Sequence, residues 1–428
     1  MVFLIRLKKM SRLAKLFSIP ELRKKVLIVA GILVVYRLFS AIPIPGIDPM
    51  RLQEYFSSNQ FLGFLNFFSG GGLSNLSLMM LGVGPYITAT IIMQLLTIIF
   101  PKLKEMYYED GQRGQAKFNQ YSRFITVPLA AIQAYGFLSL LITQGVVDRP
   151  DPFEMIRNIA VITAGSMIAL WMGELISEQK IGNGISLIIF AGIVAGLPAS
   201  AAQAIAAYTP SQLPAYVGFV VVLLALIYGI VFLNEGERRV PIAYARQVRG
   251  NKMYGGASTY LPMKVNQAGM IPLIFAISVL LFPQFIAQLA TLISAPVGVK
   301  VNSFVQSFLN NQLAYGLVYF GLVFLFTYFY SAITFNPEEV SKNLQKGGGF
   351  IPGVRPGEAT AEYFSKVTGK ITFFGAMFLG LIAVLPLIVQ AATGVQVLTI
   401  SGTAILIVVA VALETMRQID SQISVREY

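Results

Sequence analysis

Long apolar runs recur along the whole sequence, and they constrain its fold more than any other feature. An α-helix needs about 20 residues to cross a hydrocarbon core of about 30 Å. Ten runs have about this length, namely residues 26–42, 76–100, 124–147, 155–176, 185–207, 213–233, 268–292, 313–335, 371–392 and 399–416. Because lipid offers no hydrogen-bond partner to a peptide group, each run is expected to form a helix. The sequence therefore predicts an all-α membrane protein with ten transmembrane helices.

The composition excludes several classes of chemistry. Of the 428 residues, 55% are hydrophobic and 12% are charged, whereas about 25% of an average soluble protein is charged. The chain has no Cys and no His. Disulfides and thiolate chemistry are therefore excluded, and so are catalysis and metal ligation by imidazole. A phosphate-binding loop is also missing, because Gly369-Lys370 is followed by Ile371 rather than Ser or Thr. Transport by this chain would therefore need a partner or a gradient to drive it.

The distribution of positive charge predicts an orientation. Of the 32 Lys and Arg residues, only Arg51, Arg149, Arg157 and Lys300 fall on one side of the ten predicted spans, and Arg37 falls inside the first. All others fall on the opposite side. Since Lys and Arg are retained on the cytoplasmic side, both termini are predicted to be cytoplasmic.

The two ends of the chain are predicted to lie outside the membrane. Residues 1–25 are basic with interspersed Leu and Phe, which is typical of an amphipathic segment on an anionic membrane surface. The first apolar run is longer than the core of a signal peptide and has no A-x-A site after it, so an uncleaved anchor is favoured. Residues 417–428 form a short cytoplasmic tail.

The connection between the first two spans, residues 43–75, is apolar and contains Ser69-Gly70-Gly71-Gly72 near its end. It is too apolar for a solvated loop and too short to span the membrane. A re-entrant segment in a protein-lined cavity and a helix lying at the outer interface both fit this composition.

Two aliphatic pairs stand out by their spacing. Val83 and Ile87, and Ile185 and Ile189, are each separated by four residues, so each pair would stack on one helix face. The first pair lies beside Gly82, Gly84 and Pro85, which weaken a helix. Such pairs are ordinary in membrane helices, and spacing alone favours packing over a pore.

Residues 234–267 and 336–370 form two long basic loops that contain Gly and Pro. The first carries Arg238, Arg239, Arg246 and Arg249. These charges suit an acidic partner such as nucleic acid, anionic lipid or an acidic protein face. The alternative is that they serve topology alone.

Few ionisable side chains lie inside the spans, the main ones being Arg37, Glu174 and Glu414. The two Glu residues are near cytoplasmic ends, where they can reach the interface. An ion-coupled solute transporter with inverted repeats usually has a charged or unwound site at mid-depth, so this alternative is weakened but stays open. An intramembrane enzyme would need a catalytic pair that the spans do not contain.

Several longer motifs, in this order along the chain, resemble the SecY/Sec61-alpha family of protein-translocation channels. They are Phe67-Phe68-Ser69-Gly70-Gly71 with Gly84-Pro85-Tyr86-Ile87, the stretch from Ile181 to Gly196, the stretch from Lys264 to Pro272, and Phe335-Asn336-Pro337 with the stretch from Gly349 to Gly357.

The resemblance implies a fold of two inverted five-helix halves, residues 26–207 and 208–416, around a central hourglass pore. It implies a protein-conducting channel, not an enzyme, that passes unfolded secretory polypeptides and releases apolar segments into lipid between the second and seventh helices. No cofactor is implied, and the implied location is the bacterial inner (plasma) membrane.

The resemblance also implies site residues and partners. A pore ring would consist of Val83, Ile87, Ile185, Ile189, Ile274 and Ile407. A re-entrant plug within about 64–75 would contain Phe64, Leu65, Phe67, Phe68, Gly70, Gly71 and Leu73. Arg355 would join the basic loop residues in binding a cytoplasmic partner. The implied partners are SecE and SecG subunits, the SecA motor, the ribosome, a nascent polypeptide and anionic lipid.

Overall fold

The fold is that of a computed structural model of the chain. It describes residues 19–44, 72–73, 76–108, 110–143, 145, 147–206, 210, 213–244, 247–249, 252–254, 258–267, 269, 271–293, 295–393 and 396–426. The expected N-terminal segment up to residue 18 and the plug residues 64–71 lie outside this set.

Each of the ten expected spans coincides with one helix. These helices are α2 (Pro20–Ser40), α5 (Gly84–Ile99), α7 (Gly111–Thr143), α8 (Pro152–Glu178), α9 (Gly184–Ala206), α10 (Leu213–Glu235), α11 (Ile271–Ile293), α13 (Gln312–Thr334), α15 (Glu358–Thr393) and α16 (Gln396–Arg426). Within the described residues, three further helices lie between them: α6 (Pro101–Tyr108), α12 (Ala295–Asn310) and α14 (Pro337–Lys346). The all-helical membrane architecture predicted from the apolar runs is therefore confirmed.

Fewer helices pass a strict test of length and composition. Within the described residues, five apolar stretches are long enough to cross a membrane, and the bent pair of α5 and α6 adds a sixth. The five are Gly111–Ile142, Pro152–Glu178, Tyr216–Glu235, Gln312–Lys346 and Glu358–Val389. The apolar stretches of α9 and α11 are shorter than the length that this test requires. Helix α9 contains Pro198 and α11 contains Pro283.

The second span begins later than the sequence predicted. Residues 76–83 form consecutive turns, and the helix starts only at Gly84. The backbone of Leu76 and of Gly82 has positive φ angles of 39° and 51°, which no right-handed helix accommodates. Pro85 then occupies the first turn of α5, where its missing N–H costs nothing.

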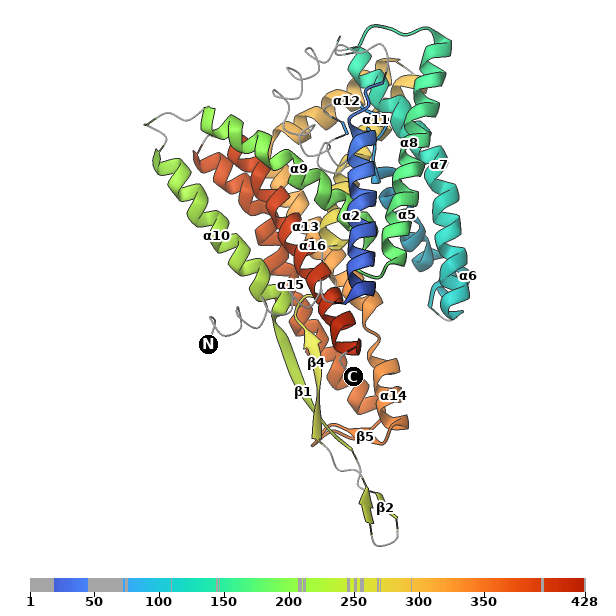
Figure 1. The fold of residues 1–428 in the computed structure, drawn as a ribbon, viewed down its shortest axis with the longest axis vertical. Coiled ribbons are helices and arrows are strands. Elements are labelled where there is room, and N and C mark those ends of the chain that lie inside the picture. Colours follow the sequence, from blue (N-terminus) through green and yellow to red (C-terminus); the bar gives the residue numbers. More distant parts are fainter. Residues whose placement is uncertain are drawn as a thin grey trace.

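Seven of the described helices form a closed circuit in which each contacts the next. The order around the circuit is α5, α8, α9, α16, α15, α13 and α11, and α11 contacts α5 again. Outside the circuit, α2 packs on α8 and α9, α7 packs on α5, α8 and α11, and α10 packs on α15 and α16. Figure 1 shows α2, α7 and α8 along the long axis of the molecule, with α10 inclined on the opposite side.

The two basic loops fold together beyond one end of the helix bundle (Figure 1). Strands β1 (Glu237–Tyr244) and β4 (Ser258–Lys264) form an antiparallel hairpin with Val240 opposite Leu261, and a small pair of strands, β2 (Gln247–Arg249) and β3 (Lys252–Tyr254), lies within it. Strand β5 (Gly349–Phe350) pairs with the other edge of β1. We call the described residues within 237–264 and 336–370 together the lobe.

The lobe has a hydrophobic core of its own. Its buried residues are Val240, Met263, Ile351, Phe364, Val367 and Ile371, which come from the hairpin, from the turn after β5 and from the first half of α15. At its edge, the Asn336 side chain accepts a hydrogen bond from Glu338 N at 3.1 Å and caps α14. The lobe therefore sits on α15 as a packed unit.

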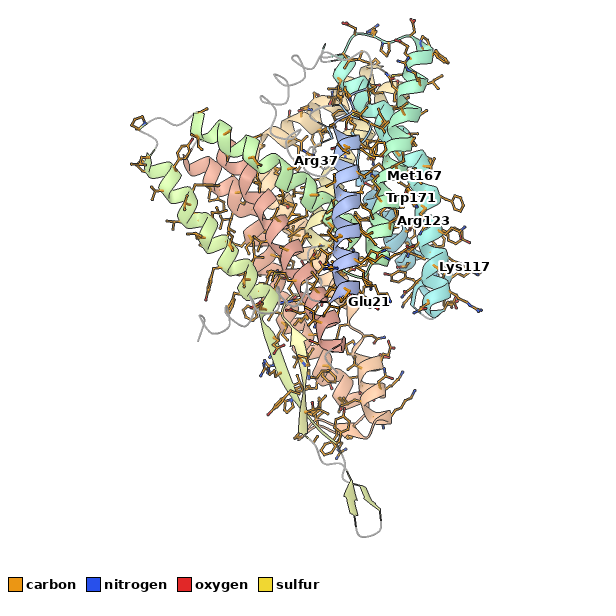
Figure 2. The ribbon with its side chains drawn as sticks, viewed as in Figure 1. Glu21, Arg37, Lys117, Arg123, Met167 and Trp171 are labelled. Atoms are coloured by element: carbon orange, nitrogen blue, oxygen red, sulfur yellow. The ribbon has the colours of Figure 1, made fainter. Side chains whose placement is uncertain are left out.

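Both described ends of the chain lie at the same end of the bundle as the lobe (Figure 1). Leu22 at the start of α2 is fully buried against Ile423 near the end of α16. In Figure 2, Glu21 marks the same end of α2, and Arg37 lies toward the other end. An even number of crossings requires this arrangement.

Candidate functional site

The six predicted ring residues come from four helices of the closed circuit. Val83 precedes the first residue of α5 and Ile87 lies in its first turn, while Ile185 and Ile189 belong to α9, Ile274 to α11 and Ile407 to α16. All except Ile185 are between 0% and 7% exposed, and they belong to one continuous hydrophobic cluster. Ile185 is half-buried and packs against that cluster. The cluster also contains many other core residues, so the ring assignment stays a prediction.

Val83 and Ile87 keep their predicted stacking although Val83 is not inside the helix. The amide of Ile87 donates to the carbonyl of Val83 at 3.1 Å, which is the first turn of α5. The turn that carries Val83 lies close against α8. A Cβ on Gly165 would lie 1.8 Å from the carbonyl oxygen of Leu78, so only glycine at this position lets the turn approach so closely.

The turn between α8 and α9 sets the position of the second aliphatic pair. Asn183 caps α9, since its Oδ1 accepts from the amides of Ile185 at 3.1 Å and Ser186 at 3.2 Å. The amide of Gly184 donates to Ser177 Oγ at 2.9 Å, and Ser177 Oγ donates to the carbonyl of Gly173 at 2.9 Å. These bonds join the end of α8 to the start of α9 and thereby orient Ile185 and Ile189.

The contact between α5 and α11 is one of the places where the first five spans meet the last five. Behind this contact, Phe275 of α11 makes edge-to-face contacts with Phe326 and Tyr330 of α13, with ring centroids 5.8 Å and 6.3 Å apart. Edge-to-face aromatic pairs add specificity to apolar packing. The side of α11 that faces α13 is therefore firmly packed.

Of the seven predicted plug residues, only Leu73 belongs to the described part of the chain. It is 1% exposed and lies in a second cluster with Leu76, Met80 and Phe137. The carbonyl of Gly72 accepts from the amide of Ser77 at 2.9 Å and from its Oγ at 3.0 Å. This end of the predicted segment 64–75 is therefore held against α7.

The predicted partner-binding arginines are partly described. Arg238 and Arg239 are exposed on β1, and Arg239 pairs with Glu237 at 2.8 Å. Arg355 is exposed in the turn after β5, where its carbonyl accepts from Thr360 Oγ1 at 2.8 Å. Arg246 and the side chain of Arg249 lie outside the described residues. The lobe thus brings Arg355 onto the same packed unit as Arg238 and Arg239.

The pairing of the two basic loops was not predicted. Both were expected as loops, but the first contains a strand in which buried Val240 and Ile242 alternate with exposed residues. Alternation with a period of two is the usual strand signal, and it was present in the sequence. No sequence signal pointed to the pairing of β1 with β5, because β5 has only two residues.

Glu174 has a partner that the sequence analysis did not assign. Arg123 Nε of α7 lies 2.6 Å from Glu174 Oε1 of α8, and Figure 2 labels Arg123 on the lower part of α7. The side chains are 48% and 27% exposed, so the pair is partly solvated and its contribution to stability is small. It joins α7 to α8 near the end that faces the lobe.

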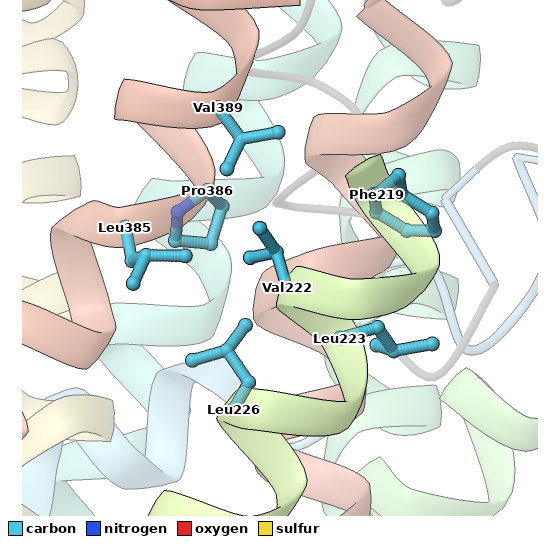
Figure 3. Close-up of a pocket in the computed structure, with 7 residues that line it drawn as sticks. All are labelled: Phe219, Val222, Leu223, Leu226, Leu385, Pro386 and Val389. Atoms are coloured by element: carbon cyan, nitrogen blue, oxygen red, sulfur yellow. The ribbon is translucent and has the colours of Figure 1, made fainter. Parts of the chain in front are cut away.

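A small apolar pocket lies elsewhere, between α10 and α15 (Figure 3). It is lined by Phe219, Val222, Leu223, Leu226, Leu385, Pro386 and Val389. None of the predicted ring residues lines it.

Comparison with known proteins gives a consistent result. The family model described as SecY matches residues 77–416. The protein translocase subunit SecY of Mycobacterium tuberculosis is 42% identical over 431 residues, covering 95% of this chain and 96% of the relative. The subunit of the same description from Streptomyces coelicolor is 42% identical over 433 residues, covering 97% and 98%.

The fold is also similar to that of solved structures. One described as a protein conducting channel superposes with a TM-score of 0.60 at 18% identity, covering 92% of each chain. Another, concerned with the plug domain of the SecY protein, superposes with a TM-score of 0.59 over the same shares. With a family model matching most of its length and relatives at 42% identity over nearly all of it, the chain belongs to the SecY family.

Proposed function

We propose that this chain is the protein-conducting channel subunit of a bacterial translocase. It passes unfolded secretory polypeptides across the plasma membrane and releases apolar segments sideways into lipid between α5 and α11. The observation that supports the proposal most directly is the closed circuit of seven helices, with Val83, Ile87, Ile189, Ile274 and Ile407 in one buried cluster. Membership of the SecY family supports the same function.

A waist of aliphatic side chains suits this function for two physical reasons. Moving an ion through it would require dehydration at a site that offers no polar replacement, which costs several kcal/mol or more. Aliphatic contacts are also non-directional, so the ring closes around many peptide sequences and binds none of them tightly. A sufficiently apolar segment leaves sideways because it partitions favourably into lipid.

We infer that the lobe faces the cytoplasm, with both termini on that side. The charge asymmetry supports this orientation, and so does the clustering of the lobe, the start of α2 and the end of α16 at one end of the bundle. The exposed Arg238, Arg239 and Arg355 are suited to an acidic surface on a motor protein or to ribosomal RNA. We propose the SecA motor, the ribosome and anionic lipid as partners there, and SecE and SecG as membrane subunits.

The test is crosslinking of a stalled secretory chain. Because the protein has no cysteine, a single engineered cysteine or photo-reactive residue can be placed at residue 189, which is fully buried in the cluster. The matched control is Trp171 on α8, which is 59% exposed. A channel is expected to crosslink from residue 189 and not from 171. Saturable uptake of a small solute without any crosslink would favour the ion-coupled transporter instead.

A further inference from the structure

The segment that joins the lobe to α11 is held by side-chain hydrogen bonds on two sides. On the first side, Asn266 Nδ2 donates to Asn234 Oδ1 at the end of α10 at 2.8 Å, and to the carbonyl of Gly269 at 3.1 Å. Asn266 is 7% exposed. Gly269 has a φ angle of +64°, a conformation that glycine adopts without strain. The bond to Gly269 therefore fixes the turn that precedes α11.

On the second side, Gln267 reaches a pair of hydroxyls. Ser331 Oγ of α13 lies 3.3 Å from Gln267 Oε1 and 2.7 Å from Thr372 Oγ1 of α15. Ser331 and Thr372 are 3% and 5% exposed. Because a hydroxyl has a single proton to donate, the consistent arrangement is that Thr372 donates to Ser331 and Ser331 donates to Gln267. We call Asn234, Asn266, Gln267, Ser331 and Thr372 the linker cluster.

The backbone of the same segment is also held. The amide of Val265 donates to the carbonyl of Gly236 at 2.9 Å, which closes the base of the hairpin. The segment lies directly on α15, since a Cβ on Gly375 would come within 2.9 Å of the carbonyl oxygen of Val265. Val265, Asn266 and Gln267 therefore cannot move along α15 without breaking contacts with α10, α13 and α15.

This position connects two parts of the molecule that the proposed function assigns to different tasks. On one side the linker continues β4, whose Met263 lies in the lobe core with Phe364 and Val367 of α15. On the other side it continues directly into α11, which contacts α5. The linker is the direct covalent connection between the lobe and α11, and the linker cluster holds it where it leads into the first turn of α11.

We propose that the linker cluster positions the first turn of α11 and thereby stabilises the closed α5–α11 contact. The inference rests on the proposed function, because it assigns that contact as the place of opening. Asn234, Asn266, Gln267, Ser331 and Thr372 act as positioning residues and hold α11 in the closed arrangement. Loss of one of their hydrogen bonds is expected to shift the closed–open equilibrium toward open about five-fold, which corresponds to about 1 kcal/mol.

The test measures the separation of α5 and α11 in the purified full chain, in lipid vesicles without substrate. Spin labels are attached at Leu95 of α5 and Phe282 of α11, which are 38% and 42% exposed, on a chain with no other cysteine. Pulsed electron–electron double resonance gives the distribution of distances between the two spin labels. Thr372→Val keeps the side-chain shape and removes the hydroxyl, and it is expected to increase the longer-distance population about five-fold.

The matched control is Thr327→Val on α13. Thr327 is 3% exposed, like Ser331, but its Oγ1 donates to Val323 O of its own helix at 2.6 Å. The control is expected to leave the distribution unchanged. If Thr372→Val does not fold, Ser331→Ala tests the same bonds. An unchanged distribution in these variants, or an equal shift in the control, would overturn the positioning role. The crosslinking test above decides the proposed function separately, because it uses a substrate and this test does not.

Discussion

Gly184 lies at a close approach of α9 to α8, and Gly184→Ala tests how this approach holds the predicted ring in place. A Cβ at this position would lie 1.8 Å from the carbonyl oxygen of Gly173 and 2.9 Å from Ser177 Oγ, whereas ordinary contact begins at 3.4 Å. To remove the clash with the Gly173 carbonyl oxygen, α9 would therefore have to move away from α8 by 1.6 Å, the difference between 3.4 Å and 1.8 Å. The hydrogen bond from the amide of Gly184 to Ser177 Oγ is expected to break in the process.

The expected loss of stability has two parts. Forcing extra volume into a packed site costs about 1–3 kcal/mol, and the lost hydrogen bond costs about 1 kcal/mol. Gly184→Ala is therefore expected to lower the free energy of unfolding by roughly 2–4 kcal/mol. The measurement is equilibrium unfolding in mixed micelles that contain an increasing fraction of a denaturing detergent. Because α9 carries Ile185 and Ile189, its displacement is also expected to increase ion flux through the resting protein in lipid vesicles.

The same helix provides a matched control. A Cβ on Gly196 would meet no atom within 4 Å, so Gly196→Ala is expected to be neutral, or slightly stabilising by up to about 1 kcal/mol through helix propensity. If Gly184→Ala and Gly196→Ala unfold with the same free energy, the close approach of α8 and α9 does not hold this part of the fold. If Gly184→Ala destabilises the protein but leaves ion flux unchanged, the link from this turn to the ring is wrong.

Three further changes test other parts of the site. Ile189→Asn would bring an amide into the fully buried cluster and is expected to make the resting channel leak small ions, so an unchanged flux in vesicles would exclude Ile189 from the ring. Arg355→Glu reverses an exposed charge on the lobe and is expected to slow partner-driven transport with complex assembly intact, whereas unaltered transport rates would remove that role. Gly165→Ala would push against Leu78 O and is expected to lower the free energy of unfolding by about 1–3 kcal/mol, while Gly31→Ala, where a Cβ meets nothing within 4 Å, should not.

Much of the architecture could be predicted because membrane insertion depends on local sequence. Hydrophobic length is a property of a single run, and each of the ten predicted runs coincides with one helix. The start of the second helix was misplaced, because the positive φ angles at Leu76 and Gly82 depend on how the turn packs on Gly165. The site was less accessible, since the spacing of Val83 with Ile87 and of Ile185 with Ile189 is ordinary in membrane helices. The resemblance to the SecY family, rather than the spacing, singled out the ring.

By itself, the sequence determined the helical membrane architecture, the approximate positions of the spans and the absence of thiol and imidazole chemistry, because these depend on local hydrophobicity and residue type. Only the tertiary structure decided which distant segments meet. The pairing of β1 with β5 joins two loops about a hundred residues apart into one lobe. The linker cluster brings Asn234, Gln267, Ser331 and Thr372 together from four segments of the chain. Such contacts depend on the three-dimensional packing of helices, and no short stretch of sequence encodes them.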